Sequence, residues 1–171
     1  NIKIALKGDY NVLNSTAAII ICLSIGIKIN IIKNALKKFS GVERRMTKIF
    51  KKKSIEFYDD YAHHPTEISA VLKSVKDVHA SRKIISVFQP HRFSRVNFLK
   101  NDFSNAFKLA DKVLLCPIYS AGEKRDKNYN HIEFAKLISS NSKVQVIIVN
   151  EQSELNKFCK HNLINDEIVI G

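Results

Sequence analysis

After Gly41 the sequence alternates between short runs rich in β-branched residues and longer amphipathic runs. We expect strands in the first kind of run and helices in the second. The predicted strands are residues 55–58, 83–88, 112–116, 144–149 and 167–170. Such alternation is typical of βαβ units, so the sequence predicts an α/β fold with a doubly wound, mostly parallel sheet.

The start of the chain follows a different pattern. Residues 11–25 are nearly all apolar, and their length and alanines favour a buried helix, with Gly26 as its C-terminal stop. Asn30 is suited to cap a second helix, whose apolar residues recur at helical spacing before Gly41 ends it. We therefore expect a small helical unit ahead of the α/β part.

The composition is that of a globular protein with an excess of positive charge. The 171 residues include 28 Lys and Arg against 16 Asp and Glu, a net charge of +12. A basic module that binds nucleic acid is therefore one alternative function, and a non-catalytic interaction domain is another. The lysines are scattered, however, and we expect their one tight run, residues 51–53, to form a solvated turn. We expect neither a nucleic-acid nor a membrane partner.

The cysteines and the apolar runs suggest a cytoplasmic protein. Cys22, Cys116 and Cys159 are widely separated and form no CxxC pair, so we expect neither a disulfide framework nor a zinc site. The longest apolar run, residues 17–25, is shorter than the roughly 20 residues of a membrane-spanning helix. The chain starts at an asparagine and stops in an apolar strand, so we expect both ends to be cuts through a longer protein.

Polar clusters follow the first three predicted strands. Ligands of open α/β sheets bind beyond the carboxyl ends of the strands, so these clusters mark the candidate site. The segments 59–67, 89–95 and 117–123 contain three histidines, paired aspartates and a pair of arginines. The next strand end, residues 150–152, carries no such cluster.

The arginines offer the most definite chemistry. Arg92 and Arg95 are three positions apart at the predicted start of a helix, where they would share a face and receive a carboxylate or a phosphate. A surface salt-bridge pair is the alternative. His91 beside them could shape a pocket or titrate near neutral pH.

The acidic and histidine residues are less specific. Asp59 and Asp60 could bind a metal, a ribose or a lysine, or could cap a helix. We expect no metal site, because the adjacent His63 and His64 should point in different directions. Pro65 suits the first turn of a helix and leaves both histidines on its entry loop. The sequence contains no glycine-rich phosphate loop and no Walker lysine.

Five segments, in this order, resemble the Mur ligase family, and in particular those members that join L-alanine to UDP-N-acetylmuramate. The segments are residues 8–14, 39–45, 59–65, 88–95 and 119–123. They span nearly the whole chain. The related ligases that recycle a tripeptide are the alternative within the family, but they are not expected to carry the Gln-Pro-His-Arg-Phe-Ser-Arg run of residues 89–95.

The resemblance implies a piece of a three-domain enzyme. Residues 1–42 would be the end of the central ATPase domain, and residues 43–171 would be the Rossmann-like C-terminal domain that binds the amino acid. The full-length protein would be an ATP-dependent, amide-forming ligase that works through an acyl phosphate in peptidoglycan precursor synthesis. ATP and Mg²⁺ would be bound mainly by the missing part of the central domain, so this chain alone should be inactive.

The resemblance also implies roles for individual residues. Asn11, Asn14, Arg45 and Asp60 match nucleotide-binding positions of the family, the last of them approaching the ribose. The family usually has histidine where Tyr10 stands.

The amino-acid pocket is implied in the same way. Tyr61, His91, Arg92 and Arg95 match the positions that form the L-alanine pocket, with the arginines on the carboxylate. His63 and His64 would line the site.

Overall fold

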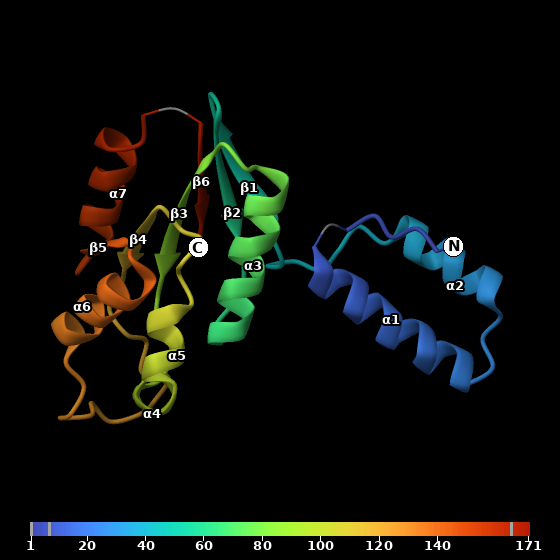
Figure 1. Ribbon diagram of the computed structural model, residues 1–171, viewed down its shortest axis with the longest axis horizontal. Coiled ribbons are helices and arrows are strands. Elements are labelled where there is room, and N and C mark those ends of the chain that lie inside the picture. Colours follow the sequence, from blue (N-terminus) through green and yellow to red (C-terminus); the bar gives the residue numbers. More distant parts are fainter. Residues whose placement is uncertain (1, 7, 165) are drawn as a thin grey trace. The chain divides into compact units, whose positions relative to one another are not determined.

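The computed structural model describes residues 2–6, 8–164 and 166–171. The chain falls into two compact units, Asn1–Glu43 and Arg44–Gly171, and each is described by itself (Figure 1). Among the described residues no helix is both long enough and apolar enough to cross a membrane.

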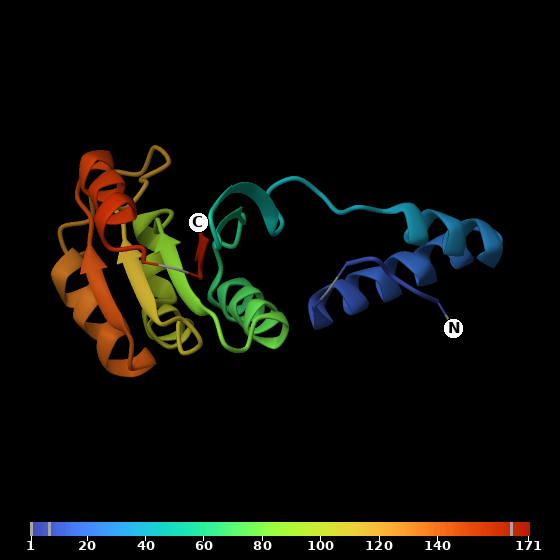
Figure 2. The same ribbon diagram turned by 90° about the horizontal axis from the view of Figure 1, so that it is seen from above.

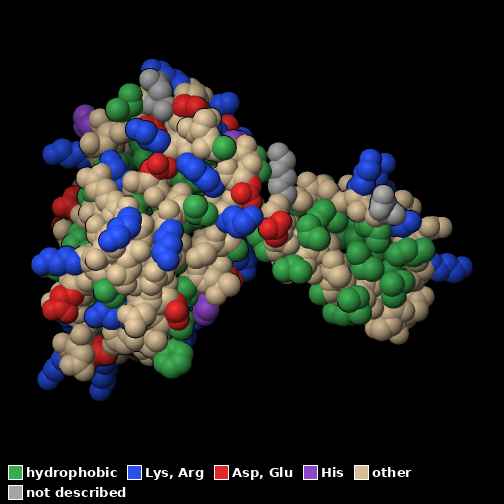
Figure 3. Space-filling model, viewed as in Figure 1, with side chains coloured by type: hydrophobic (Ala, Val, Ile, Leu, Met, Phe, Trp, Pro, Cys, Tyr) green, Lys and Arg blue, Asp and Glu red, His purple; other side chains and the backbone are tan. Residues whose placement is uncertain are grey.

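The first unit is a pair of helices, α1 (Asp9–Ser24) and α2 (Ile29–Lys38), which pack against each other. The expectation that the first helix is buried is wrong: no residue of α1 is buried, and Leu13 is 70% exposed. Among the described residues of this unit, α2 is the one helix that packs against α1, and most apolar side chains of α1 remain exposed. Apolar side chains accordingly gather on the surface of this unit (Figure 3).

The ends of α2 also differ from the sequence prediction. Lys28, in an extended conformation, is the N-cap, and Asn30 lies inside the first turn without capping the helix. The helix ends at Lys38 rather than at Gly41, because Phe39 already has an extended conformation.

The second unit contains a six-stranded sheet in the order β1-β2-β6-β3-β4-β5. The edge strand β1 is antiparallel to β2, and the other pairs are parallel. The strands are β1 (Thr47–Lys52), β2 (Ile55–Asp59), β3 (Lys83–Phe88), β4 (Lys112–Leu115), β5 (Gln145–Ile148) and β6 (Glu167–Ile170). The predicted α/β fold with a mostly parallel sheet is confirmed.

Strand β1 corrects the interpretation of the lysine run. Lys51 and Lys52 are strand residues paired with Glu56 and Ile55, and only Lys53, with a φ of 55°, belongs to the turn. Lysine on an edge strand keeps its charge in water, so the strand forms despite its polar sequence.

Helices cover both faces of the sheet. The chain moves in one direction across the sheet through α3 (Pro65–Val78), α4 (Phe93–Phe98), α5 (Lys100–Asn105) and α6 (His131–Ser142), and returns through α7 (Gln152–His161) to β6. Connections between parallel strands are right-handed, so a helix that connects strands in the reverse direction lies on the other face of the sheet from the helices before it. Helix α7 therefore lies across the sheet from α3 and α6 (Figure 2).

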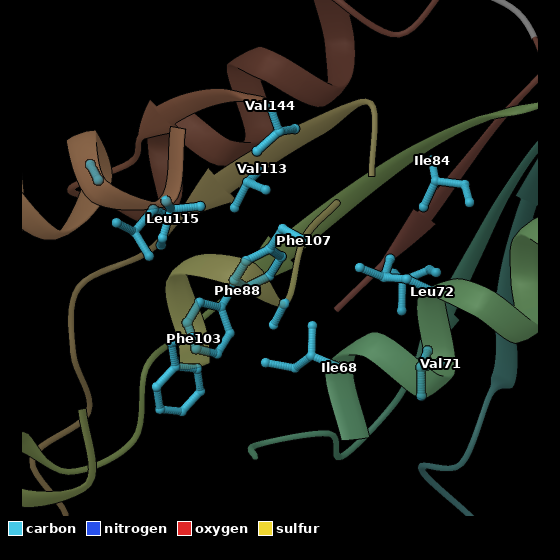
Figure 4. Close-up of a cluster of buried hydrophobic side chains, with 14 of the residues drawn as sticks. Ile68, Val71, Leu72, Ile84, Phe88, Phe103, Phe107, Val113, Leu115 and Val144 are labelled. Carbon is cyan, nitrogen blue, oxygen red and sulfur yellow. The ribbon is translucent and has the colours of Figure 1, made fainter. Parts of the chain in front are cut away.

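The larger apolar core lies between the sheet and α3, α5 and α6 (Figure 4). Phe88 of β3 meets the rings of Phe103 and Phe107 at centroid distances of 5.5 and 5.2 Å. The helical stretch between Phe93 and Asn105 is divided into α4 and α5, because Leu99 leaves the helical conformation.

The carboxylate of Glu56 is buried near the start of β2. Glu56 of β2 is 8% exposed and accepts hydrogen bonds from the Tyr58 hydroxyl at 2.6 Å and Lys48 Nζ at 2.9 Å. Arg82 lies 3.6 Å from the same carboxylate. The hydrogen bond from Tyr58, then that from Lys48, outweigh burial and lower the pKa of Glu56 to about 2.

The low pKa of Glu56 predicts a loss of stability in acid. Because the folded value is depressed from 4.5 to about 2, this carboxylate stabilises the fold above pH 4.5, and the contribution is lost as the pH falls toward 2. Glu56→Gln should flatten the fall in unfolding free energy over that interval, measured by urea denaturation at a series of pH values. Tyr58→Phe, which removes the strongest hydrogen bond, should shift the fall to higher pH. An unchanged slope in Glu56→Gln would contradict the assignment.

Candidate active site

A cleft of about 760 Å³ opens at the carboxyl edge of the sheet. It is lined by Arg44, ahead of β1, by the segments that follow β2, β3, β4 and β5, and by Gly171 after β6. This is the edge where open parallel sheets bind ligands.

Asp60 organises the segment after β2. Its side chain is buried, and its two oxygens accept hydrogen bonds from the backbone N–H groups of Met46 at 2.8 Å and Ala62 at 2.9 Å. Burial raises the pKa of Asp60, and these two hydrogen bonds oppose the rise. The carboxylate thus fixes the turn that carries Tyr61 and His63 into the cleft.

Tyr61 stands between a cation and an imidazole. The Arg44 guanidinium lies 4.6 Å from the centre of the Tyr61 ring, and the His63 ring centre is 5.0 Å away. Arg44 Nε also lies 3.4 Å from the Asp59 carboxylate, and the Arg44 backbone carbonyl accepts a hydrogen bond from the Tyr61 N–H at 2.7 Å. Tyr61 is therefore held from its main chain and from its ring face.

The two arginines at the start of the second unit have different surroundings. Arg44 lines the cleft, whereas Arg45, expected near the nucleotide, pairs with Glu67 at 3.5 Å and does not line it. The sequence carries no signal that separates these neighbours, because their directions depend on the positive φ of 58° at Arg44.

The two histidines also separate, as their adjacency predicts. His63 lines the cleft, and its Nδ1 lies 2.8 Å from the Tyr61 carbonyl oxygen. His64 is the N-cap of α3, where its ring accepts the Thr66 N–H at 3.3 Å, and it lies outside the cleft. Glu67 completes a capping box around the start of this helix.

The segment after β3 brings His91 to the cleft. His91 forms a parallel bridge with Tyr119, and their ring centres are 5.4 Å apart. Burial, then the charges of Arg95 and Arg92, lower the pKa of His91, so its ring is neutral near pH 7. Its Nδ1 is buried and has no hydrogen-bond partner among the described residues.

The arginines of this segment adjoin the cleft through His91. Arg92 is exposed at the N-cap of α4, and Arg95 follows within the helix; neither lines the cleft itself. Nη1 of Arg95 is buried without a hydrogen-bond partner among the described residues. A buried guanidinium nitrogen of this kind is suited to an anionic ligand.

The remaining predicted residues lie in the first unit. Asn11 is half-buried in α1, where its N–H donates to the Gly8 carbonyl at 3.0 Å, and Asn14 is exposed on the same helix.

One wall of the cleft is not expected from the sequence. Asn150, Glu151 and Gln152 line it, although their strand end carries no polar cluster of the kind found after β2 and β3. They lie there because β5 pairs with β4 and α7 begins at Gln152. Strand order, which the sequence pattern does not reveal, decides this placement.

The described residues include no group of three or more His, Cys, Asp or Glu side chains arranged to hold a metal ion. On the visible face of the second unit, Lys and Arg side chains are spread among other residue types rather than gathered in one patch (Figure 3).

Two curated relatives of the chain have the same name. The chain is 51% identical over 170 residues to the UDP-N-acetylmuramate–L-alanine ligase of Pelagibacter ubique, covering 99% of this chain and 37% of that protein. It is 52% identical over 121 residues to the enzyme of that name from Brachyspira hyodysenteriae, covering 71% and 26%. The chain thus spans well under half the length of these relatives.

A solved structure agrees with the sequence relatives. The UDP-N-acetylmuramate-alanine ligase of Thermotoga maritima matches 99% of this chain and 35% of that chain, with a TM-score of 0.72 and 30% identity. Residues 44–170 match the family described as "Mur ligase, glutamate ligase domain". Because that match covers most of the chain, the protein belongs to the Mur ligase family.

Proposed function

We propose that this chain is the C-terminal portion of an ATP-dependent ligase that adds L-alanine to UDP-N-acetylmuramate. The observation that carries the proposal is the 51% identity to a ligase of that name across 99% of the chain. The cleft at the carboxyl edge of the sheet, flanked by His91 and the arginine pair, supplies the matching chemistry.

The amino acid is held by the segment after β3. Arg92 and Arg95 bind the carboxylate of L-alanine, the second through the guanidinium nitrogen that is buried without a partner among the described residues. Because the His91 ring is neutral, a ring nitrogen can accept a hydrogen bond, and the ring does not repel the ammonium group of L-alanine. The ring of Tyr61, backed by Arg44, closes the other side of the pocket.

The nucleotide contacts are assigned to residues of both units. Asn11, Asn14, Arg45 and Asp60 serve the nucleotide, and residues 1–42 are the end of the central ATPase domain. The exposed apolar side chains of α1 support this role, because the rest of such a domain would cover them. For Asp60 the contact to ribose competes with its two backbone hydrogen bonds.

ATP phosphates and Mg²⁺ are not matched by residues of this chain. The sequence has no glycine-rich phosphate loop, and the described residues form no metal-binding group. Both are therefore held by the part of the ligase outside this chain, in the cytoplasm where ATP is available.

The chemistry is carboxylate activation. ATP transfers its γ-phosphoryl group to the lactyl carboxylate of UDP-N-acetylmuramate, and the alanine amine attacks the resulting acyl phosphate. The amide forms as phosphate leaves, and the amine loses its protons to solvent. This domain contributes orientation: it binds the amino acid so that the amine faces the acyl phosphate when the domains close.

The chain alone should fold without turning over. Mixed with ATP, UDP-N-acetylmuramate and L-alanine, it should release no phosphate above background, whereas the full-length ligase should release phosphate only when L-alanine is present. Phosphate release by the chain alone would refute the division of labour proposed for it.

Arg92→Ala in the full-length ligase should mainly raise the KM for L-alanine. The loss of a charge-assisted hydrogen bond to the carboxylate predicts an increase of about 10- to 100-fold, with a smaller change in kcat. Arg125→Ala removes an exposed arginine that does not line the cleft and should leave both constants near wild type. An unchanged alanine dependence in Arg92→Ala would remove this arginine from the pocket.

A further inference from the structure

Arg92 has a backbone conformation that an arginine does not adopt freely. Its φ is 67° and its ψ is 132°, in the half of conformational space that favours glycine. Such a conformation persists only where the surrounding structure holds it. The side chain of Arg92 is exposed, so the restraint acts on the main chain around it.

The residues on both sides of Arg92 are held by one segment after β4. On the N-terminal side, the Arg92 N–H donates to the Tyr119 carbonyl at 2.8 Å, and the Tyr119 N–H donates to the Pro90 carbonyl at 2.8 Å. On the C-terminal side, Ser94 donates twice to the Glu123 carboxylate, from its N–H at 3.1 Å and from its hydroxyl at 2.5 Å.

The chain between Tyr119 and Glu123 forms a turn that brings the Glu123 carboxylate to Ser94 at the start of α4. Ala121 and Gly122 both have positive φ, 51° and 86°, and the Glu123 N–H donates to the Ser120 carbonyl at 3.0 Å to close a turn. A Cβ added at Gly122 would meet nothing within 4 Å, so the glycine is needed for its backbone conformation rather than for space.

Ser94 is the main partner of Glu123, and the Phe93 backbone and the charge of Arg92 act on the carboxylate in the same direction. Among the described residues it forms no ion pair within 4 Å, and both of its oxygens bind Ser94. Hydrogen bonds from the Ser94 side chain and backbone lower the pKa of Glu123, so the carboxylate is ionised near neutral pH. Arg92, the N-cap of α4, makes no side-chain cap, and Glu123 supplies from a distant segment the acceptor that the helix start lacks.

We propose that Glu123 is a positioning residue for the amino-acid pocket: by binding both donors of Ser94, it holds Arg92 in the conformation that presents its guanidinium to the substrate carboxylate. This inference rests on the proposed function and adds a residue that does not itself touch the substrate. A carboxylate that served only to stabilise α4 would affect folding without affecting Arg92.

The structural half of the proposal can be tested on this chain without any activity. Coupling constants between the Arg92 amide and α protons, combined with the intraresidue nuclear Overhauser effect between the same two protons and measured on isotope-labelled protein, report the sign and size of its φ. We expect Glu123→Gln to move Arg92 out of the positive-φ region. Asp126→Asn is the matched control, because Asp126 accepts a hydrogen bond from Asn97 further along α4 and, among the described residues, forms no hydrogen bond with Ser94. A positive φ retained in Glu123→Gln would overturn the proposal.

The functional half is tested in the full-length ligase with a double-mutant cycle. Glu123→Gln should raise the KM for L-alanine about tenfold, as expected for a lost charge-assisted hydrogen bond, while the KM for ATP and the melting temperature stay near wild type. In an Arg92→Ala background the same substitution should add almost nothing, because its effect passes through Arg92.

The opposite results are equally informative. A full effect of Glu123→Gln in the Arg92→Ala background would show that Glu123 acts elsewhere, and a joint rise of both KM values with a lower melting temperature would reduce it to a stabilising contact. If the wild-type ligase shows no alanine-dependent phosphate release, the proposed function fails, and the coupling constants still decide whether Glu123 holds Arg92.

Discussion

The backbone hydrogen bonds of β6 hold the two halves of the site together. β6 comes from the end of the chain yet lies in the middle of the sheet, between β2 and β3. Gly171, directly after it, accepts the Asp60 N–H at 2.7 Å and donates to the Tyr58 carbonyl at 3.0 Å. The segments that carry Tyr61 and His91 follow strands that are not direct neighbours, so their separation across the cleft is set by this one strand.

Much of the fold could be predicted because strands and helices have different apolar periods. The pattern identifies the five parallel strands but not β1, whose lysines suit an edge where charge stays in water. It also cannot say what covers an apolar helix: α1 has the composition of a buried segment, and its own unit leaves it exposed. The sequence pattern also does not predict strand order, because the return of the chain through α7 to β6 follows from the handedness of crossovers and not from local sequence.

The candidate site was predictable where chemistry and strand ends coincide. Asp60, Tyr61, His63 and His91 meet at the cleft because all follow strands that end at the same edge. The wall formed by residues 150–152 could not be predicted, because its position depends on strand order. Nor could the sequence separate Arg44 from Arg45, whose directions are set by an unusual backbone angle. The strained conformation of Arg92, which costs on the order of 1–3 kcal/mol in such cases, is likewise visible only in three dimensions.

The most direct test of the account is a crystal structure of the full-length ligase with L-alanine and a nucleotide bound. If the proposed function is right, L-alanine lies at the end of the cleft beside His91, with its carboxylate within hydrogen-bond distance of Arg92 and Arg95 and its amine directed away from them. Amino-acid density at the opposite wall, beside residues 150–152 and out of reach of both arginines, would contradict it.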